Sequence, residues 1–290
     1  MEKAKVYFTK ELTVNGLKHL FEALQPKLNG KVAVKVHSGE VGNQNFIRPQ
    51  FFQELIQSVN GTIVECNTAY EGKRNTTKEH WETMKLHGWC DVAKVDIMDE
   101  EGEFSLPVPN GRQITENFVG SHLKEYDSML VLSHFKGHPM GGFGGALKNI
   151  SIGIASAHGK AHIHGAGDAE KIWTADHDSF LEAMADTAKS IVDYYKENIV
   201  YINVMANMSV DCDCCAVAED PKIKDIGILA SFDPVALDQA CVDLVYASED
   251  PGKAHLIERI ESRNGIHTIE AAADLNVGSR SYALCSIDEA

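Results

Sequence analysis

The chain has 290 residues, enough for one large domain or two ordinary domains with a substantial buried core. Its 27 Lys and Arg residues are outnumbered by 42 Asp and Glu residues, so its formal charge is −15. This balance argues against a protein that binds nucleic acid or an anionic membrane through a basic surface. With 44% hydrophobic and 24% charged residues, the composition is that of a globular protein and excludes disordered, collagen-like and coiled-coil classes.

The cysteine content and the lengths of the apolar segments indicate in which cellular compartment the protein is found. Seven cysteines are too few and too uneven in number for a secreted disulfide framework, which favours a reducing cytoplasm. The N-terminal residues develop no apolar signal core, and no stretch reaches the roughly 18 uncharged apolar residues of a membrane span. We therefore expect a cytoplasmic protein that does not enter a membrane.

The first third of the chain alternates short β-branched runs with segments of helical period. Each strand is followed by a helix, which favours a parallel sheet covered on both faces. Asn75 is expected to cap the third helix, because its short side chain can accept first-turn amide hydrogens. The predicted strands are 6–8, 31–36 and 62–65, and the predicted helices are 14–24, a segment around 51–56, and 76–87.

Residues 95–118 interrupt this rhythm. Two short apolar runs, 96–98 and 104–106, precede a turn at 109–111, which predicts a β-hairpin or small antiparallel insertion. The pattern then resumes with strands at 128–133, 199–204 and 226–230 and helices at 180–196 and 234–246. No repeat or linker is present, so we predict one α/β domain over residues 1–290, with a mostly parallel sheet, helices on both faces and the small antiparallel insertion.

A glycine-rich segment follows the predicted strand 128–133, at the end of the strand where ligands bind in open α/β sheets. Five glycines lie within nine residues, and such backbone can approach an anion closely. Two lysines in the segment supply charge and are candidate catalytic groups. The spacing matches neither the Walker loop nor the dinucleotide motif, and the alternative is a tight structural turn. The candidate ligand-binding glycines are Gly141, Gly142, Gly144 and Gly145, and the lysines are Lys136 and Lys148.

Histidine is concentrated in the same part of the chain, with five of the 13 histidines within 31 residues. Neutral imidazole is a common metal ligand, and His162 and His164 would point to one side if their segment were extended. A solvated surface or an anion clamp is the alternative. The candidate metal ligands are His134, His138, His162 and His164.

Three thiols lie within four positions at Cys212, Cys214 and Cys215. Thiolates on an irregular loop suit a soft metal ion or an iron–sulfur cluster. The spacing differs from a zinc knuckle, so a fourth ligand would come from another cysteine, a histidine or a second subunit. Buried structural cysteines are the alternative.

Two further loops follow predicted strands and are expected at the same rim of the sheet. Residues 37–49 contain Arg48, which can hold a carboxylate or phosphate in a bidentate manner. Residues 66–70 follow the next strand. Solvated connections are the alternative for both loops.

Several motifs together resemble the DUF362 family, over roughly residues 31–246. Many members of that family resemble iron–sulfur proteins and carry a ferredoxin-type module, which this chain lacks, since no cysteine lies between His164 and Val200. The resemblance implies that Cys212 and Cys214 are candidate ligands. The motifs are 133–138, 142–149, Gly159-Lys160, 211–214, 225–231 and 233–239.

These observations favour a protein that binds a metal ion or iron–sulfur cluster and a small anionic ligand, as in a metal- or iron–sulfur-dependent oxidoreductase. The expected protein partner is a second copy of the chain or a redox protein, without nucleic acid or membrane. Two alternatives remain: a module that binds phosphate or nucleotide without chemistry, and a metal delivery or storage protein. Asp233 is expected to cap a helix at Pro234, and no partner can be named for Asp238.

Overall fold

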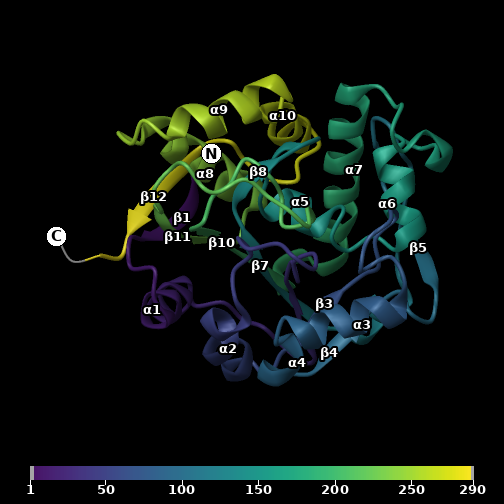
Figure 1. Ribbon diagram of the computed structural model, residues 1–290, viewed down its shortest axis with the longest axis horizontal. Helices are drawn as coiled ribbons and strands as arrows, with labels where there is room; N and C mark the ends of the chain where they lie inside the picture. Colours follow the sequence, from purple (N-terminus) through teal and green to yellow (C-terminus); the bar gives the residue numbers. More distant parts are fainter. Residues whose placement is uncertain (1–2, 289–290) are drawn as a thin grey trace.

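A computed structural model describes residues 3–288 and centres on an eight-stranded sheet (Figure 1). Among the described residues seven of these strands run in the same direction, and only β11 (Gly227–Ser231) pairs antiparallel with both of its neighbours. In their order across the sheet, the strands are β12 (Tyr282–Ser286), β1 (Ala4–Thr9), β11 (Gly227–Ser231), β10 (Ile199–Met205), β7 (Ser128–His134), β2 (Val32–Lys35), β3 (Thr62–Glu65) and β4 (Val95–Ile97).

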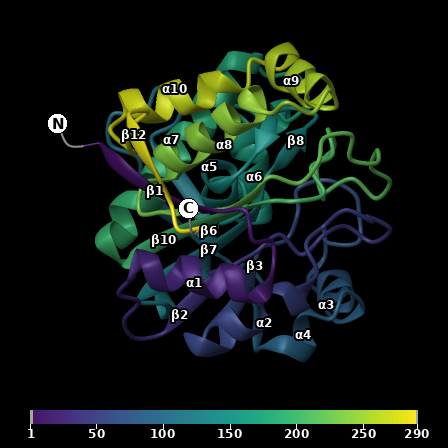
Figure 2. The same ribbon diagram turned by 90° about the vertical axis from the view of Figure 1, so that its left-hand side faces the viewer.

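Helices cover both faces of the sheet, because successive side chains of each buried strand point to opposite faces. Ala33 and Val131 belong to one hydrophobic core, whereas their neighbours Val34 and Leu130 belong to the other. The two helical layers lie on either side of the sheet in Figure 2. One layer contains α1 (Val14–Leu24), α2 (Pro49–Ser58), α3 (Thr77–Leu86) and α4 (Trp89–Val92), and the other contains α5 (Ala146–Ile150), α7 (His177–Tyr195), α8 (Pro234–Ala247), α9 (Lys253–Ser262) and α10 (Ile266–Asp274).

The order of the strands creates a switch point between β2 and β7. From β2 the chain proceeds through β3 to β4 in one direction, whereas from β7 it proceeds to β10 in the other. Loops that leave two such neighbouring strands diverge and leave a crevice at the carboxyl ends of the strands. The fold therefore places the segments after β2 and β7 around one hollow.

The structure confirms the predicted α/β class, the mostly parallel sheet and the small antiparallel insertion. The insertion is the hairpin of β5 (Glu103–Pro107) and β6 (Glu116–Gly120). The expectation that 96–98 belongs to it is wrong, because these residues contribute to β4, which pairs with β3 in the main sheet. The predicted cap Asn75 is also wrong, since Thr76 Oγ1 accepts the Glu79 amide at the start of α3.

Several elements have no counterpart in the sequence prediction. The glycine-rich segment folds back as a two-stranded hairpin of β8 (Lys136–His138) and β9 (Gly142–Gly144). Residues 157–164 form helix α6 (Ala157–His164), which packs against α7. Helices α9 and α10 and the edge strand β12 complete the C-terminal part. The remaining short elements are the 3-10 turns η1 (Ser121–Glu125), η2 (Ala169–Lys171) and η3 (Lys196–Asn198).

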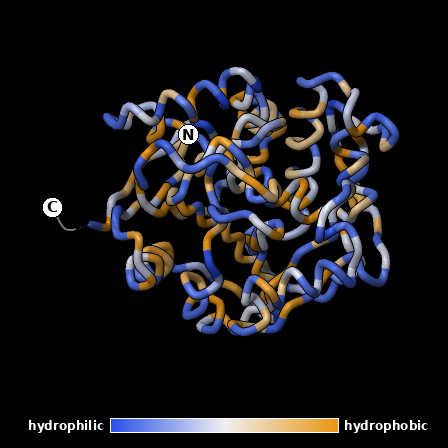
Figure 3. The backbone as a smooth tube through the Cα atoms, in the orientation of Figure 1, coloured by the Kyte–Doolittle hydropathy of each residue, from blue (hydrophilic) through white to orange (hydrophobic). Residues whose placement is uncertain are grey.

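Polar and apolar stretches alternate along the whole described chain (Figure 3). Among residues 3–288, none of the helices combines the length and the apolar character that crossing a bilayer requires.

Asp233 caps α8, as the sequence predicts, and also fastens the C-terminal segment. One carboxylate oxygen accepts the Ala236 amide at 2.9 Å and the other accepts the Ser279 amide at 2.8 Å. We expect Asp233→Ala to lower the free energy of unfolding by about 1–2 kcal/mol, because both amides lose their acceptor. Asp233→Asn retains one acceptor oxygen and should lose less. Urea denaturation measures both, and equal stability of Asp233→Ala and the unmodified chain would contradict the assignment.

Candidate functional site

A cavity of about 300 Å³ lies at the carboxyl ends of the parallel strands. Its walls come from the segments after four strands: His37 follows β2, Tyr70 follows β3, Lys148 follows β7 and Cys214 follows β10. The expected rim is therefore a real feature of the fold, because parallel strands end at one edge of the sheet. The loop after β10 is held against the loop after β2 by the Glu40 amide, which donates to the Asp213 carbonyl at 2.7 Å.

Two of the three clustered thiols lie beside a histidine. The donor atoms of His138, Cys212 and Cys214 all lie within 4.8 Å of one another, and Cys212 is fully buried. Cys215 lines the cavity nearby. Hydrogen bonding with Cys214, burial and the charge of Cys214 act to raise the pKa of Cys212, the charges of Lys136 and Lys148 act to lower it, and the net shift of that pKa is downward. A lowered pKa favours the thiolate, which is the form of cysteine that binds metals and attacks electrophiles.

The hydrogen bonds of His138 determine what this ring offers to the thiols. Its Nδ1 accepts the amide hydrogens of Met140 and Gly141 at 3.1 and 2.8 Å. Burial lowers the pKa of His138 to about 3, so the ring is neutral and its single proton lies on Nε2. In this tautomer the Nε2 atom of His138 has no lone pair for a metal ion.

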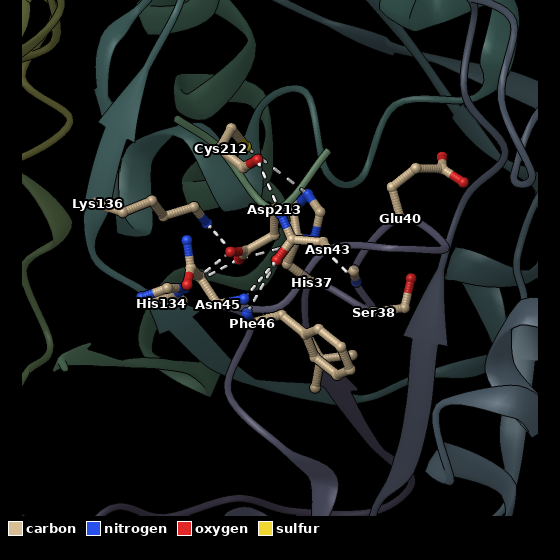
Figure 4. A network of polar contacts seen from close by, with 12 residues as sticks. His37, Ser38, Glu40, Asn43, Asn45, Phe46, His134, Lys136, Cys212 and Asp213 are labelled. Carbon is tan, nitrogen blue, oxygen red and sulfur yellow. Dashed lines mark hydrogen bonds and ion pairs between the residues drawn. The ribbon is translucent and has the colours of Figure 1, made fainter. Parts of the chain in front are cut away.

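His134 is part of a buried charge network around Asp213 (Figure 4). Its Nδ1 lies 3.0 Å from the Asp213 carboxylate and its Nε2 lies 2.7 Å from the Ala206 carbonyl. Both partners are acceptors, so both bonds form only when both ring nitrogens carry protons, which leaves no lone pair for a metal. Lys136 Nζ completes the network at 2.9 Å from the Asp213 carboxylate.

The two remaining candidate histidines lie on helix α6, so the condition under which they would point to one side, an extended segment, is not met. His162 is not among the residues that line the cavity, and it packs against Phe118, with ring centroids 5.2 Å apart. His164 is buried and lines the cavity, and its Nδ1 donates to the Lys160 carbonyl at 2.7 Å. Burial lowers the pKa of His164 to about 4. The neutral ring therefore keeps its lone pair on Nε2.

The glycine-rich segment uses most of its amides within the protein. The amides of Ala146 and Leu147, at the start of α5, donate to the Asp238 carboxylate at 2.8 and 2.9 Å. Burial raises the pKa of Asp238 to about 6, against the opposing effect of these donors. An internal carboxylate thus occupies the place expected for an external anion. Gly144 and Gly145 line the cavity, whereas Gly141 and Gly142 are not among its lining residues.

Close packing rather than ligand binding explains Gly142. It has φ +77°, and a Cβ atom there would lie 2.8 Å from the Gly265 Cα atom. A side chain at this position would clash with backbone and strain the turn. The glycine therefore allows the hairpin to contact the segment before α10.

The sequence-predicted Arg48 lies outside the cavity lining. Its guanidinium carbon is 4.0 Å from the centroid of the Phe46 ring, and Nη2 donates to the Gln44 carbonyl at 3.2 Å. Sequence reasoning missed three cations that do line the cavity, which are Lys35, Arg74 and Lys160. The sequence could have indicated Lys35, because a lysine inside a buried β-branched strand needs an oppositely charged partner. That partner is Glu65, at 2.7 Å.

The fold and the cavity define an α/β protein whose sheet switch point carries thiols, histidines and lysines together. The family model described as "Domain of unknown function (DUF362)" matches residues 32–243. The chain belongs to this family, as the sequence motifs indicate. No curated protein matches the chain.

Two solved structures are distantly similar to this chain. A lactate racemase apoprotein from Thermoanaerobacterium thermosaccharolyticum has a TM-score of 0.49 and 16% identity, covering 83% of this chain and 57% of that chain. A protein from Thermotoga maritima has a TM-score of 0.47 and 13% identity, covering 92% and 59%. The chain spans less than two thirds of either structure.

Proposed function

We propose that this protein is an enzyme that binds a small organic anion in the cavity and acts on it with a metal ion held by Cys212 and Cys214. The proposal depends on one observation: Cys214, which lies beside the buried Cys212, lines a cavity of about 300 Å³ together with an excess of cationic side chains. Thiolates are suitable ligands for soft metals, and cationic side chains recognise anions.

The donor set favours sulfur over imidazole as the metal-binding group. His134 and His138 use their ring nitrogens in hydrogen bonds, so the thiols are the available ligands. A single ion fits better than a four-cysteine cluster, because the nearby Cys66 thiol donates to the Ile154 carbonyl at 3.3 Å and burial raises its pKa. When bound, such an ion would polarise a ligand oxygen or transfer electrons.

Side chains of the cavity supply the other functions that such an enzyme needs. Lys136 is fixed by Asp213, whereas Lys148 has no ion-pair partner among residues 3–288 and is available to a ligand. Both lysines can neutralise negative charge that develops on the ligand. His164 has a lone pair on Nε2 and can accept a proton.

Metal content tests the thiol site directly. Protein purified without oxygen and supplied with zinc, iron or copper is expected to retain one of these ions, and Cys212→Ser should bind it at least about 100-fold more weakly, because a direct ligand is lost. Cys285→Ser is the matched control, since Cys285 lies on the edge strand β12. Elemental analysis after desalting gives the result. Equal metal in Cys212→Ser and the unmodified chain would overturn the site.

A ligand-binding module without chemistry would behave differently. It predicts that an anion raises the melting temperature, that Lys148→Ala abolishes this increase, and that Cys212→Ser leaves it unchanged. The proposed enzyme instead predicts that both variants abolish turnover of the anion. Thermal unfolding with and without the anion, together with turnover assays, separates the two cases.

A further inference from the structure

Arg74 has a buried donor that nothing in the described protein satisfies. The side chain lies on the loop after β3 and the residue is only 3% exposed. Its Nε lies 3.4 Å from Glu40 and its Nη1 lies 4.0 Å from Glu65, whereas Nη2 is buried without a hydrogen-bond partner. A buried charged donor without a partner is costly, and the planar guanidinium is suited to two oxygens of a carboxylate or phosphate. Arg74 lines the cavity, where a ligand can reach it.

Lys160 is a second cation without an anionic partner. It is 5% exposed, and its ammonium group donates to the backbone carbonyls of Ala155, at 2.5 Å, and Cys66, at 3.4 Å. No carboxylate within residues 3–288 forms an ion pair with it. Burial lowers the pKa of Lys160, because the charged form is poorly solvated there. A negatively charged ligand would stabilise the charged form of Lys160 in place of the missing water.

The charges around the cavity do not balance. Five cationic side chains line it: Lys35, Arg74, Lys136, Lys148 and Lys160. Three carboxylates contact them: Glu65 pairs with Lys35, Asp213 with Lys136 and Glu40 with Arg74. Two of these positive charges therefore lack a carboxylate partner, although the whole chain carries −15. Uncompensated buried charge is strongly unfavourable, so a ligand with two negative charges fits this surplus.

We propose that the ligand is a small organic dianion, a dicarboxylate or a phosphate monoester, with one acidic group held by Arg74 and Lys160. This assignment rests on the proposed function and specifies its substrate class. The cavity volume of about 300 Å³ is at the small end of ligand sites, which favours a short molecule over a dinucleotide. Met140 and Ile152 also line the cavity and suit a short apolar body between the charged ends.

Trp173 provides a means of observing the ligand. It lines the cavity although it is 65% exposed, and its ring centroid lies 6.3 Å from that of Tyr70. Occupation of the cavity is expected to change its fluorescence. The other tryptophans do not line the cavity, and Trp173→Phe identifies the source of the signal.

The test is a fluorescence titration of the full chain with succinate, methyl phosphate and acetate, at a pH where the phosphate is doubly ionised. We expect at least one dianion to bind at least about tenfold more tightly than acetate. Arg74→Gln and Lys160→Met should each weaken that dianion by about 100-fold, because each leaves a charged group of the complex unpaired. Arg280→Gln and Lys189→Met are matched controls on exposed ion pairs and should not change binding.

Whichever of succinate and methyl phosphate binds more tightly identifies the acidic group of the ligand as a carboxylate or a phosphate.

Three results would overturn the dianion assignment: acetate binding as tightly as the dianions, no saturable binding of either dianion up to about 10 mM, or unchanged affinity in both cavity variants. Two variants are used because removal of Arg74 leaves Glu40 without its cation, and circular dichroism verifies that each variant folds. Titration of Cys212→Ser keeps this inference separate from the proposed function. If no protein retains metal, the metal-dependent enzyme fails, whereas Arg74-dependent binding of a dianion still supports the ligand class.

Discussion

Replacement of Asp213 by alanine is expected to lower the free energy of unfolding by about 3–5 kcal/mol. The Asp213 carboxylate is 1% exposed and contacts both Lys136 Nζ and His134 Nδ1. Burial alone would raise the pKa of Asp213, but the positive charges of His134 and Lys136 hold that pKa well below its usual range. Without the carboxylate, the buried Lys136 ammonium group loses its counter-charge and the His134 ring loses a hydrogen-bond acceptor. Urea denaturation at neutral pH measures the loss.

Two comparisons show whether buried charge causes this effect. Asp193→Ala removes a carboxylate from an exposed ion pair with Lys189, and should cost at most about 0.5 kcal/mol. Adding Lys136→Met to Asp213→Ala removes one unpaired cation and should restore part of the stability. A loss below about 1 kcal/mol in Asp213→Ala, or no recovery in the double variant, would show that the network does not stabilise the fold.

Acidification is expected to destabilise the protein steeply below about pH 6.5, the ordinary histidine pKa. Burial lowers the pKa of four histidines in the native state, to about 4 for His37 and His164 and about 3 for His80 and His138. Between these values and 6.5 the unfolded chain binds more protons than the native protein. Stability that is fully present above pH 6.5 is therefore lost as the pH falls towards 4.

Asp238 acts in the opposite direction. Its pKa is raised to about 6, so the native state binds this proton more readily than the unfolded chain, and stability increases as the pH falls through 6. The net difference is about three protons near pH 5, which corresponds to a slope of up to about 4 kcal/mol per pH unit. Urea denaturation at pH 7.5, 6 and 5 measures this slope. His164→Phe should reduce it by about one proton, and an unchanged stability between pH 7.5 and 5 would contradict the neutral state of these rings.

Much of the fold could be predicted from local sequence patterns. The helix Val14–Leu24 and the strand Thr62–Glu65 have the predicted bounds, and the buried strand Ser128–His134 differs by one residue. These elements have clear periodicity, which reports directly on which side chains face the core. By contrast, the strand Val95–Ile97 is only three residues long, and its pairing with β3 depends on a partner far away in the chain.

The candidate site was predicted less completely than the fold. The thiol segment and the glycine-rich segment were recognised from their unusual composition, and the structure places His138 beside Cys212 and Cys214. Arg74 was not recognised as a site residue, because a single cation on a loop has no distinguishing local pattern, and Lys160 was recognised only as part of a family motif and not as a site residue. Their importance depends on burial and on missing partners, which are properties of the folded chain.

Sequence alone determined the alternation of strands and helices, the direction of most strands and hence the edge at which the strand-following loops gather. Local hydrophobic periodicity suffices to predict these features, because it indicates which side chains each element buries. Only the tertiary structure decided which groups remain free to bind a ligand at that edge. Asp238 accepts hydrogen bonds from amides of the glycine-rich segment, and Asp213 pairs with His134 and Lys136, whereas Arg74 has a donor without a hydrogen-bond partner among the described residues. Hydrogen bonds and ion pairs between distant segments set these roles, and no local pattern encodes them.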